Sequence, residues 1–73
     1  MSTVFKSIEM VGSSRESFDD AARVAVKRAG ESMRNLEWME VVEQRGYIKG
    51  GEVREYQVKL KIWFKLEEGE KPS

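Results

Sequence analysis

The alternation of apolar and polar side chains from residue 56 to residue 66 constrains the fold of this chain more than any other feature. Successive side chains of a β-strand point to opposite faces of the sheet, so this period of two predicts a half-buried strand. Trp63 is the one large apolar side chain on the otherwise polar side of the run. The apolar side consists of Tyr56, Val58, Leu60, Ile62, Phe64 and Leu66.

Residues 36–48 are predicted to form a second strand, which a hairpin turn at Lys49–Glu52 joins to the first. The two glycines of the turn, Gly50 and Gly51, tolerate the positive φ angles of a two-residue loop. Directly opposed side chains of a hairpin share one face of the sheet. The expected pairs are Ile48 with Val53, Gln44 with Gln57, Val42 with Lys59, and Trp38 with Trp63.

The N-terminal half predicts one strand over residues 3–11 and one helix over residues 14–33. Between them lies the break Gly12-Ser13-Ser14, where Ser13 and Glu16 match the S-x-x-E capping box of a helix start. The apolar residues that recur at helical spacing are Phe18, Ala22, Ala25, Ala29 and Met33. The order of elements is therefore β-α-β-β, which places the chain in the α+β class.

The hairpin is predicted to turn one face to the helix and to leave the other face uncovered. The helix-facing side is expected to hold Met39, Val41, Tyr56, Val58, Leu60 and Ile62. The opposite side is expected to hold Trp38, Glu40, Val42, Gln44, Gln57, Lys59, Lys61 and Trp63. Two large aromatic side chains on a face that the single helix cannot cover mark an interaction surface.

Composition narrows the function further. Thirteen Lys and Arg balance thirteen Asp and Glu, which argues against binding nucleic acid or a membrane through a general positive charge. The chain has no cysteine and no histidine, which excludes disulfides, thiolate metal sites and the usual general base. Because no apolar run is long enough for a signal peptide or a membrane span, we expect a cytoplasmic protein. Its 73 residues are expected to form a single domain, 1–73, with a polar tail over 67–73, and to need self-association for stability.

Trp38 and Gln57 are the side chains with the clearest functional chemistry. Tryptophan offers a flat π-face for stacking, and an amide both donates and accepts hydrogen bonds at the edge of a planar heterocycle. From composition alone, an anchor between subunits is the favoured interpretation of Trp38. Arg45 leaves two interpretations as well, a phosphate partner or an exposed strand charge.

Catalysis has little support, because the paired carboxylates Asp19-Asp20 and Glu67-Glu68 are explained by a helix start and a solvated end. An alternative function from another class is a sheet surface that binds single-stranded nucleic acid. Trp38 and Trp63 would then stack on bases, with Lys59 and Lys61 nearby, although the zero net charge opposes it.

Several motifs at matching spacing resemble the dodecins over nearly the whole chain. They are Val4-Phe5-Lys6, Val11-Gly12-Ser13-Ser14, Glu16-Ser17-Phe18, the segment Arg34–Gly46, Tyr56-Gln57-Val58-Lys59-Leu60 and Phe64-Lys65-Leu66-Glu67. The resemblance implies a three-stranded antiparallel sheet wrapped around one helix. It also implies a hollow homododecamer that binds flavin, as FMN or riboflavin, without catalysing a reaction.

The same resemblance implies roles for individual residues. Two flavin rings would stack between two symmetry-related copies of Trp38, and Gln57 would bond the polar edge of a ring. Arg45 would reach an FMN phosphate and Glu43 the ribityl hydroxyls. Lys65 stands where members that bind coenzyme A often carry arginine, so coenzyme A is a weaker expectation. Trp63 stands where a small residue is frequent. The resemblance therefore implies a flavin store that quenches flavin photochemistry, with no nucleic-acid or membrane partner and with any metal site left unassigned.

Overall fold

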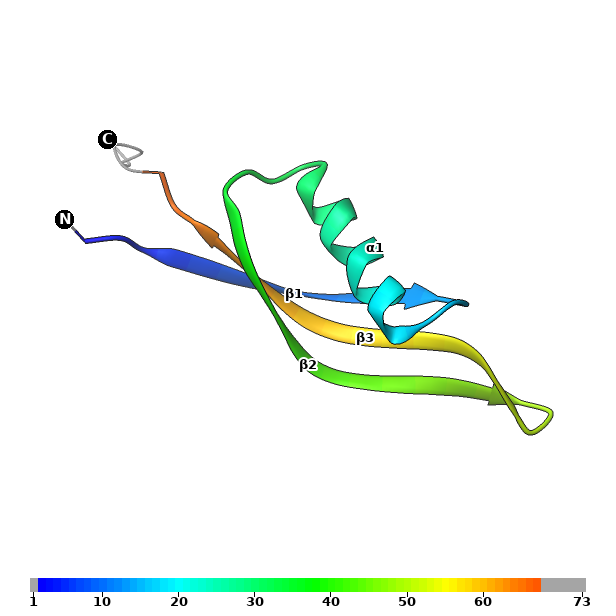
Figure 1. Cartoon of the computed structure of the whole chain (residues 1–73). Coiled ribbons are helices and arrows are strands. Elements are labelled where there is room, and N and C mark those ends of the chain that lie inside the picture. Colours follow the sequence, from blue (N-terminus) through cyan, green and yellow to red (C-terminus); the bar gives the residue numbers. More distant parts are fainter. Residues whose placement is uncertain (1, 68–73) are drawn as a thin grey trace.

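The computed structural model describes residues 2–67 and has the element order β-α-β-β. Its elements are β1 (Phe5–Ser14), α1 (Phe18–Gly30), β2 (Leu36–Lys49) and β3 (Glu52–Lys65). The strands form one antiparallel sheet in the order β1-β3-β2, with β3 in the centre. The helix lies over one face of the sheet, and the β2–β3 hairpin extends beyond it (Figure 1). The predicted α+β class and the three-stranded antiparallel sheet are confirmed.

The helix begins later than the sequence predicted, because β1 continues through the glycine that looked like a break. A Cβ atom on Gly12 would overlap the carbonyl oxygen of Ala21 and lie 3.0 Å from the Cβ of Ala25. Glycine is therefore required here for the close approach of helix and strand, and it does not end the strand. The predicted strand end at Val11 is wrong, since β1 runs to Ser14.

The predicted capping box of Ser13 and Glu16 is also wrong. The N-cap is Ser17, whose Oγ accepts a hydrogen bond from the backbone N–H of Asp20 at 3.0 Å. This contact satisfies one of the unpaired donors at the helix start. The other end of α1 is also shorter than expected, at Gly30.

The core is a thin layer of small helix residues against branched residues of the central strand. Because alanine side chains are short, α1 approaches the sheet closely along this seam. The fully or almost fully buried apolar residues are Ala21, Ala25 and Ala29 of α1 and Val58, Leu60 and Ile62 of β3. The expectation that even-numbered positions of β3 face the helix is thus confirmed for Val58, Leu60 and Ile62 in the middle of the strand.

Helix α1 covers β1 and β3 and leaves β2 largely bare. Met39 and Val41 lie opposite Ile62 and Leu60 on the helix side, as predicted, yet they stay 40% and 48% exposed. A hollow of about 310 Å³ remains beside them, lined by Ala22, Arg23, Val26, Lys27 and Met39. The single chain therefore presents apolar surface on the helix side of its sheet.

Irregularities in the β2–β3 pairing change which residues share a face. Ile48 pairs with Val53 and Trp38 with Trp63, as predicted, but the pairing of residues 43–47 with β3 is shifted by one residue. The shifts lie between Val41 and Glu43 and between Tyr47 and Ile48. Gln57 therefore lies opposite Arg45, and Lys59 opposite Glu43.

The predicted partners of Gln57 and Lys59 were accordingly wrong. Gln44, expected beside Gln57, lies opposite the buried Val58 and so belongs to the helix side of the sheet. A β-bulge of this kind inserts one residue into one strand and restores the alternation beyond it with opposite phase. Its consequence here is that Glu43 and Arg45 are brought to the face that carries Trp38.

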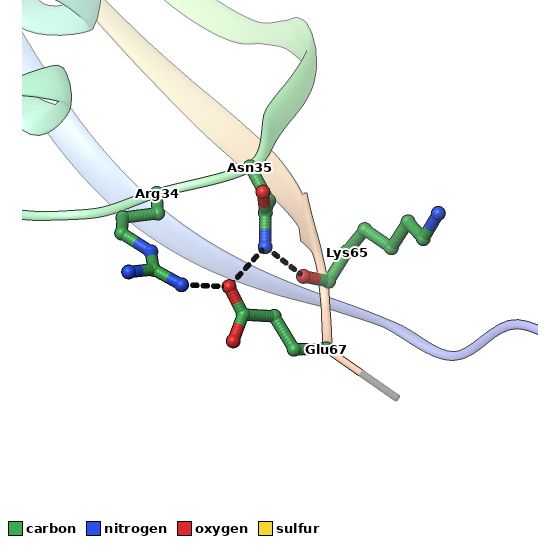
Figure 2. A network of polar contacts seen from close by, with 4 residues as sticks. All are labelled: Arg34, Asn35, Lys65 and Glu67. Atoms are coloured by element: carbon green, nitrogen blue, oxygen red, sulfur yellow. Dashed lines mark hydrogen bonds and ion pairs between the residues drawn. The ribbon is translucent and has the colours of Figure 1, made fainter. Parts of the chain in front are cut away.

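The junction before β2 is fixed to the end of β3 by a small polar network (Figure 2). Asn35 has a positive φ of 64°, a conformation that asparagine tolerates better than most residues. Its Nδ2 group donates to the Lys65 carbonyl oxygen at 3.4 Å and to Glu67 Oε2 at 3.2 Å. Glu67 also forms an ion pair with Arg34. Of the predicted tail, Glu67 thus belongs to the fold, and residues 68–73 lie outside the described part.

Candidate functional site

The sheet face away from α1 carries all four residues expected at the site, which are Trp38, Glu43 and Arg45 of β2 and Gln57 of β3. We call it the open face; it is formed by alternating residues of all three strands. Its members are Phe5, Ser7, Glu9, Val11 and Ser13 of β1, Trp38, Glu40, Glu43 and Arg45 of β2, and Gln57, Lys59, Lys61 and Trp63 of β3. Since no helix within residues 2–67 covers this face, its side chains are available to a ligand or to another subunit (Figure 1).

At one end of the open face, an aromatic cluster surrounds Trp38. The indole of Trp38 is 58% exposed, and the ring of Phe5 lies 4.9 Å from it between centroids, tilted by 50°. Trp63 lies directly opposite Trp38 in the strand pairing, and its Nε1–H donates to Glu40 Oε1 at 3.3 Å. The cluster therefore leaves a large part of the Trp38 indole exposed, while the neighbouring ring of Phe5 restricts its movement from one side.

Phe5 contacts the candidate site residue Trp38 and was not singled out from the sequence. The signal was present, because Phe5 occupies the side of the first strand opposite Ile8 and Met10, where an apolar ring has no core to enter. What the sequence did not show is that this ring reaches across the sheet to Trp38.

At the other end of the open face, Gln57 is bonded to Arg45. The Arg45 Nε–H donates to Gln57 Oε1 at 2.9 Å. Both residues border a hollow of about 440 Å³ that is also lined by Gly46, Tyr47 and Glu55. The carboxylate of Glu55 accepts a hydrogen bond from the Ser13 hydroxyl, which ties this end of β1 to β3. Tyr47, which is 58% exposed, was not singled out from the sequence.

Glu43 lies between the two ends and has a cationic partner. Its Oε1 is 3.7 Å from Nζ of Lys59, and both side chains are substantially exposed. A smaller hollow of about 110 Å³ brings Glu43, Arg45, Gln57 and Lys59 together with Val11. Three of the expected site residues, Glu43, Arg45 and Gln57, are therefore neighbours in one chain.

Trp38, the fourth expected site residue, is distant from this group. Its strand partner Trp63 lies six residues from Gln57 along β3. At a rise of roughly 3.3 Å per residue, the two positions are about 20 Å apart. A single planar ring system of three fused rings is shorter than that. One chain therefore does not offer Trp38 and Gln57 to the same ligand ring, and a site that uses both must combine two subunits.

The structure adds little for a metal or a membrane. Within residues 2–67, no three acidic side chains are grouped so that they could hold a metal ion. No helix in that range combines the length and the apolar character needed to span a bilayer. Lys65 lies beside the network of Figure 2, with its backbone engaged by Asn35 and its side chain directed away from the network.

The fold and the open face define a class of small α+β proteins in which a curved sheet holds one helix and exposes aromatic side chains on its other side. The chain belongs to the dodecin family, whose family model, described as "Dodecin", matches residues 4–67.

Similar proteins agree with this assignment. The dodecin of Thermus thermophilus is 46% identical over 68 residues, covering 93% of this chain and 99% of that protein. The calcium dodecin of Mycobacterium tuberculosis is 33% identical over 64 residues, covering 88% and 90%. The solved structure of dodecin from Streptomyces coelicolor superposes with a TM-score of 0.86 at 43% identity, covering 92% of this chain and 96% of the other.

Proposed function

We propose that this protein is a flavin store: a hollow homododecamer that stacks FMN or riboflavin between tryptophans of neighbouring subunits and quenches its photochemistry. The observation that carries the proposal is the exposure of Trp38, 58% on a face that its own helix does not cover. Membership of the dodecin family supports a small flavin-binding protein.

The physical basis of binding is aromatic stacking. The ring of Phe5 packs beside Trp38, but a large part of the Trp38 side chain remains exposed. A second copy of Trp38 across a two-fold axis would complete a sandwich around two flavin rings. Each aromatic contact adds about 0.5–1.5 kcal/mol beyond the area it buries, so such a stack holds a ligand with few polar contacts.

Polar contacts at the ring edge and tail would come from the other end of the open face. Because Gln57 lies about 20 Å from Trp38 along the sheet, the Gln57 that bonds a given ring is expected to belong to a different subunit from the stacking Trp38. Glu43, which lines the smaller hollow together with Gln57, would bond the ribityl hydroxyls. Arg45, which is bonded to Gln57 and lines the larger hollow, would meet the ring edge or an FMN phosphate.

Self-association is supported by apolar surface that the single chain leaves bare. Met39 and Val41 stay exposed on the helix side of β2. Beyond the helix, the hairpin presents Ile48, 66% exposed, paired with Val53. Single exposed apolar residues are ordinary, but several of them on one uncovered strand favour an interface with another subunit.

Such a sandwich favours storage of the flavin over catalysis. A ring enclosed between two aromatic faces offers neither of its own faces to a substrate, and the open face carries no histidine or cysteine that could act as an acid, base or nucleophile.

The nucleic-acid alternative is disfavoured by the charges around the lysines of the open face. Lys59 is paired with Glu43 at 3.7 Å. Lys61 lies in register between Glu9 of β1 and Glu40 of β2. Carboxylates beside each ammonium reduce the positive potential on which binding to a phosphate backbone depends.

The proposal is tested by native mass spectrometry of the purified protein together with its absorption spectrum. We expect a particle of twelve chains that carries flavin or takes it up when riboflavin is added. A monomer that takes up none would overturn the proposal.

A further inference from the structure

The bond between Arg45 and Gln57 fixes more than the position of the glutamine side chain. A guanidinium group has only donors, whereas an amide has one accepting oxygen and one donating NH₂ group. With Arg45 Nε–H at 2.9 Å, only the oxygen of Gln57 can face it, since the NH₂ group would set donor against donor. The arginine therefore determines which way round the amide lies.

The NH₂ group of Gln57 is left for another molecule. Within residues 2–67 the side chain of Gln57 makes no hydrogen bond besides the one to Arg45. Gln57 also lines both hollows of this end of the open face, so its remaining polar group borders open space.

We propose that Arg45 is a positioning residue that holds Gln57 as a hydrogen-bond donor toward the planar ligand. This inference rests on the proposed function and deepens it by naming the atom that is recognised. The polar edge of a flavin ring presents two carbonyl oxygens with an N–H group between them. Gln57 held in this way directs its NH₂ group at a carbonyl oxygen of the ring edge, so its main role toward the ring is that of a donor.

A comparison of riboflavin with FMN distinguishes this role of Arg45 from that of a phosphate partner. Riboflavin has the same ring edge as FMN but carries no phosphate. If Arg45 acts through Gln57, its loss weakens riboflavin and FMN binding by the same factor. If Arg45 acts on the phosphate, its loss weakens FMN alone.

The experiment measures dissociation constants for riboflavin and FMN by fluorescence quenching, with the whole assembled protein and three variants. Arg45→Met removes the donor but keeps an unbranched side chain, and Arg45→Lys restores a donor. Gln57→Glu replaces the amide by a carboxylate, which has no donor. Native mass is recorded for each variant, so that only assembled particles are compared.

We expect Arg45→Met to weaken both flavins equally, by about three- to tenfold, which corresponds to one net hydrogen bond. Arg45→Lys is expected to bind both ligands nearly as the unchanged protein does. Gln57→Glu is expected to weaken both by about tenfold or more, because a carboxylate then faces a carbonyl oxygen.

Two results would overturn the inference while leaving the flavin store intact. One is a loss of FMN affinity alone in Arg45→Met. The other is unchanged or tighter binding in Gln57→Glu, since a carboxylate is the better acceptor for a ring N–H. Failure of the unchanged protein to bind riboflavin would instead overturn the proposed function, and the inference with it.

Discussion

Phe5, at the start of the first strand, contacts Trp38 of the second with ring centroids 4.9 Å apart. The two residues lie on outer strands of the sheet, on either side of β3, so this contact spans the open face. It restricts an indole that is otherwise mostly exposed. A stacking residue that is held in place before the ligand arrives loses less conformational entropy on binding.

Replacing Phe5 by alanine should therefore weaken riboflavin binding although Phe5 is not proposed to touch the ring. We expect a loss of about threefold, from the lower end of the energy of one aromatic pair. Riboflavin titration by fluorescence measures it, and Phe5→Tyr, which keeps the ring, is the matched control. Equal affinities for the alanine and tyrosine variants would show that Phe5 does not support Trp38.

Gly12→Ala should destabilise the protein, because the added methyl group would overlap the Ala21 carbonyl and press on Ala25. We expect a cost of about 1–3 kcal/mol, as for other insertions into a tight contact. Chemical unfolding monitored by circular dichroism measures it.

Gly30→Ala is the control for that substitution. At Gly30 an added Cβ would meet only Leu36 Cδ1, at the ordinary distance of 3.9 Å. Alanine has the higher helix propensity, so this variant should be neutral or more stable by up to about 1 kcal/mol. Equal effects of the two substitutions would contradict the close helix–strand contact at Gly12.

The turn glycine Gly50 offers a test of backbone conformation alone. Its φ is 63°, and a Cβ added there would meet nothing within 4 Å. Gly50→Ala should cost about 1–2 kcal/mol, the penalty of the left-handed region for a residue with a Cβ. Gly50→Asn should cost less, because asparagine tolerates that region. Thermal unfolding compares the stability of the two variants. An asparagine variant that is less stable than the alanine variant would contradict the turn assignment.

Met39→Lys should disrupt assembly and leave the chain folded. Met39 lines the apolar hollow beside α1 yet is 40% exposed in the single chain, so a charge costs little until another subunit covers it. We expect a smaller native mass with unchanged helix and strand content in the circular dichroism spectrum. Thr3→Lys, which adds the same charge at an exposed position, is the control. A full-sized particle of the Met39 variant would exclude this surface from the interface.

Much of the fold was predictable because its signals are local. The alternation of β3 and the Gly50-Gly51 turn specify the hairpin, and the helical spacing of alanines specifies the buried side of α1. The open face could be inferred because a single helix packs against only one side of a sheet. These features depend on near neighbours in the sequence.

The features that the sequence did not settle depend on packing between distant segments. Two serines, Ser13 and Ser17, each precede an acidic residue by three positions, so both were plausible caps. The close approach at Gly12 extends β1 and selects Ser17.

The bulge had only a faint signal. Val41 and Val42 are adjacent apolar residues, but so are Trp38 and Met39, so such a pair does not say where the register changes. Pairing with β3 decides it, and this decision brings Arg45, in place of Gln44, to Gln57.

The stacking role of Trp38 is tested most directly by titrating riboflavin into the unchanged protein and into Trp38→Ala while recording flavin fluorescence. Native mass must first show the same assembled particle for both. We predict strong quenching by the unchanged protein and an affinity at least about tenfold lower for the variant, since each bound ring loses an indole face. Equal quenching by both proteins at the same concentration would contradict the stacking site.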